Sequence, residues 1–425
     1  MTIAKREFLR YNLCMSSVIL CRADNPIFYK RSYIMKKILA LFLAVLMIAT
    51  CAATLSSCKK DSGTIKIGLS GPLTGAAASY GIAVANSAKL AIEEINAAGG
   101  LNGIKFELLS TDDAHDASKV ATNYAAMEAE GMQVALGCVT SGPCLEFAKL
   151  SKDANLFFLT PSASANDVVK ENNAYQMCFA DGNQGTYAGN YVKSLYEANT
   201  LGKLGVLYKS DDNYSTGLYE QFMATIPTAL KDAAVVATFT GDEATVDFTS
   251  QVTQLQECTF IFMPIYYTPA AAFMTKAVGK VANNATYYGC DGFDGIDTSV
   301  EGFDITTIPQ KVSMLSHFNS SATTGKAADY IKAYKAKYPN APLNQFGASA
   351  YDCVYALYYA MKTAIDAGKE ITADISASEL CEILKEQFNG SFTYTNSVTG
   401  TGTVKWASTG FVEKDAVAYV IKEAN

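Results

Sequence analysis

Two α/β lobes, each built on a doubly wound parallel sheet, are the fold that this 425-residue sequence predicts. From residue 64 onward, short apolar runs alternate with amphipathic helical patterns, which is typical of parallel sheets with helices on both faces. The alternation occurs in two series, the second of which begins after residue 185. A chain of this length with 49% apolar residues buries at least two cores, and we expect a cleft between them.

The N-terminal part of the chain predicts targeting rather than fold. A basic start precedes an apolar run at 38–49, which is too short for a membrane-spanning helix of about 20 residues. Small residues follow and end in Leu-Ser-Ser-Cys at Cys58, which resembles a bacterial lipobox. We therefore expect a lipoprotein signal peptide at 35–57, lipidation of Cys58 and a polar tether at 58–63; an ordinary secretory signal or an uncleaved anchor is the alternative. Residues 1–34 fit none of these patterns and are interpreted as an upstream, non-native extension.

Composition argues against several classes of function. The formal net charge of -7 provides no basic footprint, so we expect no nucleic-acid partner. His115 and His317 are the two histidines, and both are expected at the surface. No nucleophile-elbow, zinc-protease or phosphate-loop motif occurs, so we expect neither an enzyme nor a metal or cofactor. After Cys58 the cysteines are odd in number and form no C-x-x-C pair, which predicts buried, unpaired side chains. They are Cys138, Cys144, Cys178, Cys258, Cys290, Cys353 and Cys381.

The first series begins with a strand and a turn-rich loop that carries Tyr80. Asp112 and Asp113 end the second strand, where we expect them to hold a turn by accepting backbone hydrogen bonds. The predicted elements are strands at 65–69 and 106–109 and helices at 88–96 and about 117–130.

A β-α-β unit follows, and it is the most informative stretch of the chain. It consists of a strand at 134–136, a helix at about 144–155 and a strand at 156–159. Both strands lead into small hydroxyl residues, among them Thr140 and Ser141, at the carboxyl ends where open α/β sheets bind ligands. Thr140 or Ser141 can cap the helix, and the free N–H groups of its first turn form a seat for an anion such as a carboxylate.

The second series predicts a further parallel sheet and then a helical region. Its strands are expected at 204–208, 235–239, 260–263 and 286–289, and residues 312–316 then begin a return of the chain. Helices are expected through 191–195 and at 248–255, 270–281, 326–338, 349–367 and 378–388. Residues 403–406 and 418–421 are predicted to pair as two terminal β-strands.

An ordered set of segments carries a resemblance to a known family. The segments are 65–68, 71–75, 80–81, 95–103, 112–113, 139–142, 160–164 and 289–293. With them, residues 64–425 resemble the branched-chain amino-acid (Leu/Ile/Val-type) solute-binding proteins of ABC importers, which have the type I periplasmic-binding-protein fold. The resemblance implies three crossover segments between the lobes. It implies lobe one at 64–182 and 314–393, and lobe two at 183–313 and 394–425.

The resemblance also implies how an amino acid is held. The ligand carboxylate is expected on Ser141 and Ser164, and the ammonium on the Ser162 carbonyl and the Asp291 carboxylate. The remaining predicted ligand-binding residues are Tyr80, Val139, Thr140, Ala163, Tyr214, Tyr267 and Phe346, with Phe293 beside them and with Tyr266 replacing Tyr267 if the match slips by one. The alternatives are that the serines only cap helices, that Asp291 is a solvated loop residue and that the tyrosines are ordinary core or surface residues.

One departure from the family concerns specificity. Gram-negative members carry a disulfide at positions matching His115 and Thr140, and here both cysteines are absent.

The resemblance implies capture of a branched-chain or related amino acid by hinge closure, and delivery of this ligand to membrane permease subunits. It also implies that the protein is an extracytoplasmic, lipid-anchored monomer. The alternatives are another small ligand, such as an amide, urea or an aromatic acid, or a sensory receptor domain.

Overall fold

The computed structural model describes residues 63–414 and 417–424. The predicted extension at 1–34, the signal peptide at 35–57 and the lipidation site Cys58 lie outside these residues. Within the described part, no helix combines the length and the apolar character needed to cross a membrane.

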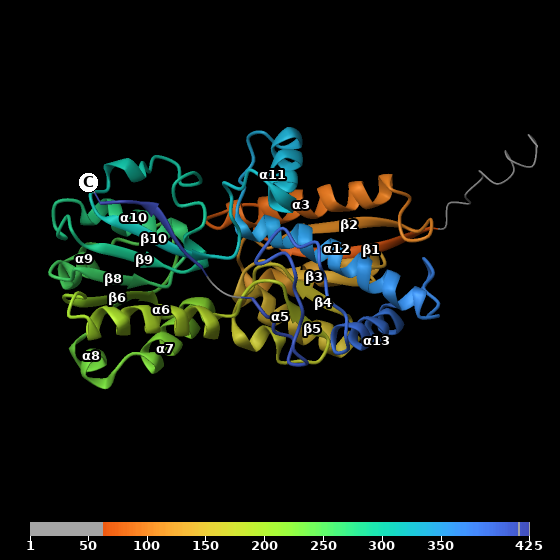
Figure 1. Ribbon diagram of the computed structural model, residues 1–425, viewed down its shortest axis with the longest axis horizontal. Helices are drawn as coiled ribbons and strands as arrows, with labels where there is room; N and C mark the ends of the chain where they lie inside the picture. Colours follow the sequence, from red (N-terminus) through yellow and green to blue (C-terminus); the bar gives the residue numbers. More distant parts are fainter. Residues whose placement is uncertain (1–62, 415–416, 425) are drawn as a thin grey trace, which may run out of the picture. The chain divides into compact units, whose positions relative to one another are not determined.

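The first sheet has five parallel strands in the order β2-β1-β3-β4-β5 (Figure 1). Its strands are β1 (Thr64–Gly71), β2 (Lys105–Asp112), β3 (Val134–Cys138), β4 (Phe158–Thr160) and β5 (Ala174–Gln176). The helices within this part of the chain are α3 (Ala78–Ala97), α4 (Val120–Ala129) and α5 (Ser141–Ala154). The predicted β-α-β unit is therefore present as β3, α5 and β4, which confirms that both hydroxyl-rich loops leave the same edge of one sheet.

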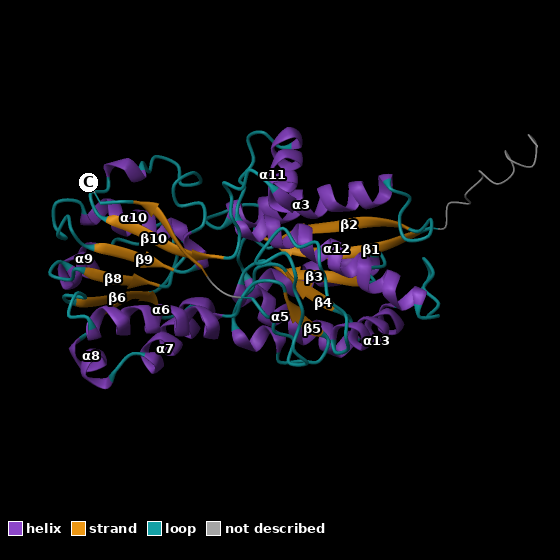
Figure 2. Ribbon diagram, in the orientation of Figure 1, coloured by secondary structure: helices purple, strands orange, loops and turns teal. Residues whose placement is uncertain are grey.

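The second sheet has six strands in the order β11-β10-β9-β8-β6-β7, and β11 alone runs antiparallel to its neighbour. Its strands are β6 (Leu204–Lys209), β7 (Val235–Phe239), β8 (Phe260–Met263), β9 (Thr286–Gly289), β10 (Lys311–Ser316) and β11 (Val417–Lys422). The helices are α6 (Asp181–Glu197), α7 (Asn213–Thr225), α8 (Thr228–Ala233), α9 (Thr249–Leu255) and α10 (Tyr267–Ala277). Helices surround the strands of each sheet (Figure 2), so the predicted fold of two parallel-sheet α/β lobes is confirmed.

Three long helices near the C-terminus return to the first lobe: α11 (Gly325–Lys337), α12 (Gln345–Asp366) and α13 (Ala377–Phe388). Helix α12 packs along α3, and α13 packs against both α12 and β3. The whole of β10 lies in the second sheet, so the boundary that the sequence set at residue 314 falls inside a second-lobe strand.

The segment at 394–414 belongs to the first lobe, which corrects the assignment of 394–425 to lobe two. Trp406 stacks on Phe392 and donates its indole hydrogen to the Gln176 carbonyl at 2.7 Å. The predicted pairing of 403–406 with 418–421 is also wrong. Val404 instead bridges Tyr394, whereas β11 pairs with β10. Alternating apolar residues identified 403–406 and 418–421 as extended. The sequence pattern does not specify their partners, which depend on tertiary contacts such as that of Trp406 with Phe392.

All seven described cysteines are unpaired and buried, as expected. The turn assigned to the aspartates is also confirmed, because the Asp112 carboxylate accepts hydrogen bonds from the Leu73, Thr74 and Ala114 backbone N–H groups.

Candidate functional site

One cavity lies where the strand ends of the two sheets meet. Its free volume for the centre of a water-sized sphere is about 10 Å³, roughly the room of one water molecule, so the walls already lie close together. The first lobe contributes Tyr80, Val139, Thr140, Ser141, Ser162, Ser164 and Phe346, and the second contributes Tyr214, Tyr266 and Asp291. The structure thus brings together all the predicted ligand-binding residues except Ala163 and Tyr267.

The start of α5 forms one part of the first-lobe wall. Helix α5 begins at Ser141, directly after β3, and no side chain caps it. A hydrogen bond of 2.8 Å joins the Thr140 hydroxyl to Nδ1 of His115, and the Ser141 hydroxyl accepts a hydrogen bond from the Ala165 N–H. The expectation that Thr140 or Ser141 caps this helix is therefore wrong, and so is the alternative that Ser141 serves only as a cap. The N–H groups of Ser141 and Gly142 have no intrahelical acceptor and lie at the positive end of the helix dipole.

The loop after β4 forms the adjoining part of this wall. The Thr160 hydroxyl accepts hydrogen bonds from the Ser162 and Ala163 N–H groups, which fixes the turn. The Ser162 hydroxyl then donates to the Val139 carbonyl at 2.6 Å, and so joins the ends of β3 and β4. Ala163 lies outside the cavity and its carbonyl accepts a hydrogen bond from the Gln176 side chain. Ala163 therefore helps to hold the loop after β4 in place and does not line the cavity.

The second-lobe wall centres on Asp291, in the turn after β9. Its side chain is buried, and Oδ1 accepts a hydrogen bond of 2.7 Å from the Tyr214 hydroxyl. Burial raises the pKa of this carboxyl to about 7, although the Tyr214 hydrogen bond opposes the shift. Oδ2 has no hydrogen-bond partner among the described residues. A solvated loop carboxylate is thus excluded, and the free oxygen lies in a residue that lines the cavity.

Glycine at position 292 makes this wall possible. A Cβ atom there would lie 2.6 Å from the Tyr214 hydroxyl oxygen and 2.9 Å from the Ile265 carbonyl oxygen. Because glycine has none, the Gly292 N–H can donate to the Tyr214 hydroxyl at 2.8 Å. The same hydroxyl donates to Asp291, so the close backbone approach at Gly292 orients the buried acid.

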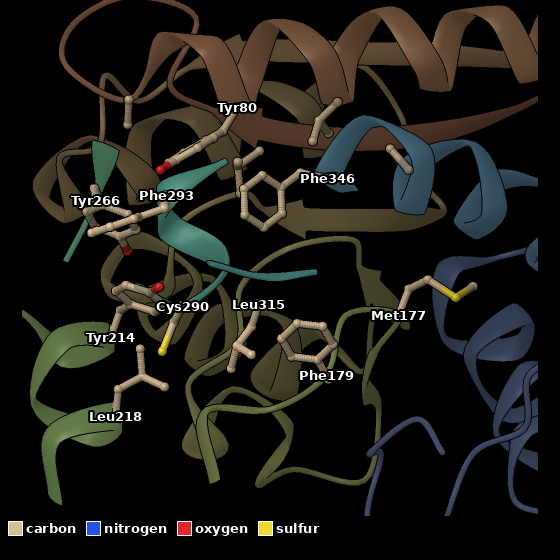
Figure 3. Close-up of a cluster of buried hydrophobic side chains, with 14 of the residues drawn as sticks. Tyr80, Met177, Phe179, Tyr214, Leu218, Tyr266, Cys290, Phe293, Leu315 and Phe346 are labelled. Carbon is tan, nitrogen blue, oxygen red and sulfur yellow. The ribbon is translucent and has the colours of Figure 1, made fainter. Parts of the chain in front are cut away.

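Aromatic rings from separate segments surround the remaining space (Figure 3). Tyr80 contacts Phe346 edge to face, with 4.8 Å between ring centroids, and Tyr214 stacks on Tyr266 at 4.7 Å. Tyr267 points elsewhere: its hydroxyl accepts a hydrogen bond from the Ser79 N–H. Of these two neighbouring tyrosines, Tyr266 and not Tyr267 lines the cavity, which corrects the assignment by one position.

Direct contacts hold the two lobes together around the cavity. The Tyr80 hydroxyl donates to the Gly292 carbonyl at 2.5 Å, and the Thr268 hydroxyl donates to the Ala76 carbonyl at 2.7 Å. Since each bond joins one lobe to the other, the structure represents a closed arrangement of the lobes.

Several buried polar residues near the cavity were missed from the sequence. Both carboxylate oxygens of Asp181, at the start of α6, lack a hydrogen-bond partner within the described parts of the chain, as do both of Glu243. The sequence shows these residues only as acids near turns, because burial depends on the other lobe.

His317 is buried and His115 is half-buried, so the expected surface positions are wrong. Across 63–414 and 417–424, no group of three or more His, Cys, Asp or Glu side chains is arranged to hold a metal ion.

Comparisons with known proteins agree with this architecture. The family model described as "Periplasmic binding protein" matches residues 64–417. The Leu/Ile/Val-binding protein BraC3 of Rhizobium johnstonii is 28% identical to the chain, over 77% of the chain and 90% of the relative.

Two solved structures share the fold. The branched-chain amino acid transporter substrate-binding protein LivJ of Streptococcus pneumoniae, in complex with isoleucine, superposes with a TM-score of 0.65 at 23% identity, covering 84% of this chain and 99% of that one. An ABC-transporter solute-binding protein of R. palustris, in complex with benzoate, gives a TM-score of 0.69 at 18% identity, covering 85% and 94%. With two parallel-sheet lobes closed on a small cavity and a family match that spans nearly all the described residues, the chain belongs to the periplasmic binding protein family.

Proposed function

We propose that this extracytoplasmic solute-binding protein captures a branched-chain or related α-amino acid between its lobes and delivers it to the membrane subunits of an ABC importer. The proposal rests above all on the two faces of the cavity. A hydroxyl-rich wall with helix N–H groups opposes a buried carboxylate whose Oδ2 lacks a partner within the described chain. The two walls are therefore complementary to a zwitterion, whose carboxylate binds at Ser141 and whose ammonium binds at Asp291.

The energetics favour an ammonium group at Asp291. Burying an ammonium without partners costs several kcal/mol, and so does leaving a carboxylate buried alone. One hydrogen bond to a charged group returns only about 1.5–3 kcal/mol, so several must converge. In the proposed complex, the Asp291 carboxylate and the Ser162 carbonyl converge on the ammonium. An amide or urea carries no charge and leaves the acid uncompensated.

The ligand carboxylate is bound without a cationic side chain. The Ser141 and Ser164 hydroxyls donate to it, together with N–H groups at the start of α5, where the helix dipole favours an anion. The rings of Tyr80, Tyr214, Tyr266 and Phe346 then provide rigid walls for the ligand side chain. The binding of Leu, Ile and Val that the name of the Rhizobium relative states supports an amino acid of this size.

Attachment to the membrane is the second part of the proposal. The sequence around Cys58 supports removal of residues 35–57 and lipidation of the cysteine, which keeps the binding domain beside its permease. Replacement of Cys58 by Ser is expected to release the protein from the membrane fraction, and mass spectrometry of the N-terminal peptide is expected to show the lipid on wild type. An unmodified Cys58 in wild type would contradict the anchor but not the ligand.

Isothermal titration calorimetry of the purified binding domain against the twenty amino acids, urea and benzoate tests the ligand class. We expect binding of one or more neutral amino acids and no heat with urea or benzoate. Binding of benzoate alone, or of no amino acid, would reject the proposal. Loss of affinity for the amino acid after esterification of its carboxylate would confirm that the hydroxyl wall needs an anion.

A further inference from the structure

One hydroxyl in the cavity wall has no role in holding the protein together. The Tyr80 hydroxyl donates to Gly292 and the Tyr214 hydroxyl donates to Asp291. Tyr266 also lines the cavity and is 5% exposed, yet its hydroxyl has no hydrogen-bond partner in the described chain. Buried polar atoms are nearly always paired in native structures, so this hydroxyl needs a partner.

The position of the Tyr266 hydroxyl is fixed by its neighbours. Its ring stacks on Tyr214 with 10° between the ring planes, and His115 packs against it edge to face at 5.3 Å between centroids. His115 in turn shares a hydrogen bond with Thr140, another cavity residue. A stacked and edge-packed ring cannot turn to find another partner, because both contacts would be lost. Thr140, His115 and Tyr266 therefore form a polar corner in the cavity.

Acidic side chains surround this corner. Burial raises the pKa of Tyr266, and Asp212 and Glu243 raise it further, so the phenol remains protonated. Glu243 is itself buried, and neither of its carboxylate oxygens has a partner in the part of the chain that the structure describes. Burial lowers the pKa of His115, so the imidazole adds no fixed positive charge. The polar corner therefore presents one phenol hydroxyl, which can both donate and accept a hydrogen bond. Its acidic surroundings favour a ligand group that can donate a hydrogen bond.

We infer that the ligand side chain carries a neutral hydrogen-bonding group, a hydroxyl or a carboxamide, that pairs with the Tyr266 hydroxyl. This inference rests on the proposed function, in which Ser141, Ser164 and Asp291 bind the α-carboxylate and the α-ammonium. Those groups leave the polar corner to the side chain. The protein then prefers a polar amino acid over the aliphatic one of the same shape: threonine over valine, and asparagine over leucine.

The reason for the preference is the cost of an unpaired buried group. An aliphatic side chain placed against Tyr266 removes water from the phenol and offers nothing in exchange. Sites built to bind a substrate hydroxyl or amide discriminate strongly against the analogue that lacks it. For one neutral hydrogen bond, we expect a difference of about tenfold in Kd between threonine and valine.

Calorimetric titration of wild-type protein with threonine, valine, asparagine and leucine tests the inference without any variant. Tighter binding of threonine than valine, by about tenfold, supports it. Equal or tighter binding of valine overturns the inference and leaves the proposed function intact. Failure of all four ligands, with no other amino acid bound, contradicts the proposed function itself.

The variant Y266F then assigns the preference to one atom. Its ring keeps the stacking on Tyr214, and we expect its Kd values for threonine and valine to become nearly equal. Y267F is the matched control, since that hydroxyl accepts a hydrogen bond from Ser79 outside the cavity. Y267F is expected to keep the wild-type ratio of the two Kd values, even if closure is weakened for both ligands. A threonine preference that survives in Y266F overturns the role of Tyr266.

Discussion

The two walls of the cavity differ in how many of their polar side chains already have a hydrogen-bond partner within the protein. On the first lobe, the Ser141, Ser162 and Thr140 hydroxyls already bond to Ala165, Val139 and His115. On the second lobe, Asp291 Oδ2 and the Tyr266 hydroxyl have no partner among the residues that the structure describes. The first wall is therefore rigid and preformed, whereas the second gains full hydrogen bonding only with a ligand.

This difference suggests how a ligand favours the closed arrangement. A ligand shifts a conformational equilibrium only through its differential affinity for the two states. Contacts with the first wall are available before the lobes meet, and contacts with Asp291 and Tyr266 require closure. The selective stabilisation of the closed state must then come from the second wall, and the hinge closure expected for this family follows.

The largest effect is expected from D291N, which removes the charge and keeps the shape. The ammonium loses its counter-charge while remaining buried, so Kd for the amino acid is expected to rise about 100-fold or more. Calorimetry measures the change. The exposed residue Asp297 supplies the control, D297N, which is expected to bind as wild type does. Undiminished binding by D291N would remove the ammonium role of Asp291.

Substitution S141A tests the preformed wall. The ligand carboxylate loses one donor, and the Ala165 N–H loses its acceptor within the protein. We expect Kd to rise about tenfold and the free energy of unfolding to fall by about 1 kcal/mol. Titration and chemical denaturation give the two values. In S194A, which alters an exposed hydroxyl on α6, neither is expected to change; a ligand effect without any loss of stability in S141A would contradict the preformed wall.

Ligand binding is expected to weaken as pH falls below about 7, where Asp291 takes up a proton. The ammonium needs the ionised carboxylate, so Kd rises by up to about tenfold per pH unit in this range. The linkage for folding has the opposite sign. The folded-state pKa is raised from its ordinary value of 3.8, so folded protein binds more protons than unfolded protein between about pH 4 and 7. Asp291 therefore lowers the stability of the ligand-free protein as pH rises through this window.

Thermal unfolding of the wild type and D291N from pH 4 to 8 isolates this contribution. The variant lacks the titrating group, so the difference in stability between the two proteins is expected to change steadily between about pH 4 and 7 and to level off above. A constant difference across this range would show that Asp291 does not take up a proton there.

The smallest effect is expected from T268V, which changes closure without touching the cavity. The variant loses the hydrogen bond to the Ala76 carbonyl across the lobes. One neutral hydrogen bond contributes about 0.5–1.5 kcal/mol, so Kd is expected to rise about two- to tenfold for every ligand alike. T253V removes a comparable hydroxyl inside α9 and is expected to leave Kd unchanged. A ligand-selective effect of T268V would argue that this bond belongs to the site.

Much of the first wall could be predicted locally. In the β3-α5-β4 unit, parallel strands must deliver Thr140, Ser141, Ser162 and Ser164 to the same edge, since their carboxyl ends coincide. The second wall could be predicted only in part. Asp291 came from the family resemblance, but the choice between Tyr266 and Tyr267 depends on which of two adjacent rings faces the other lobe. No pattern along the chain encodes that choice.

The sequence by itself determined the alternation of strands and helices, the two-lobed fold and the hydroxyl-rich edge, because local periodicity and strand direction are enough to specify them. The tertiary structure alone decided that residues 394–414 pack on the first lobe, that His317 is buried and that Asp181 and Glu243 are shielded from water. These properties arise from contacts between segments far apart in the chain. Burial, and with it the unpaired state of the Tyr266 hydroxyl, exists only when both lobes exclude solvent together.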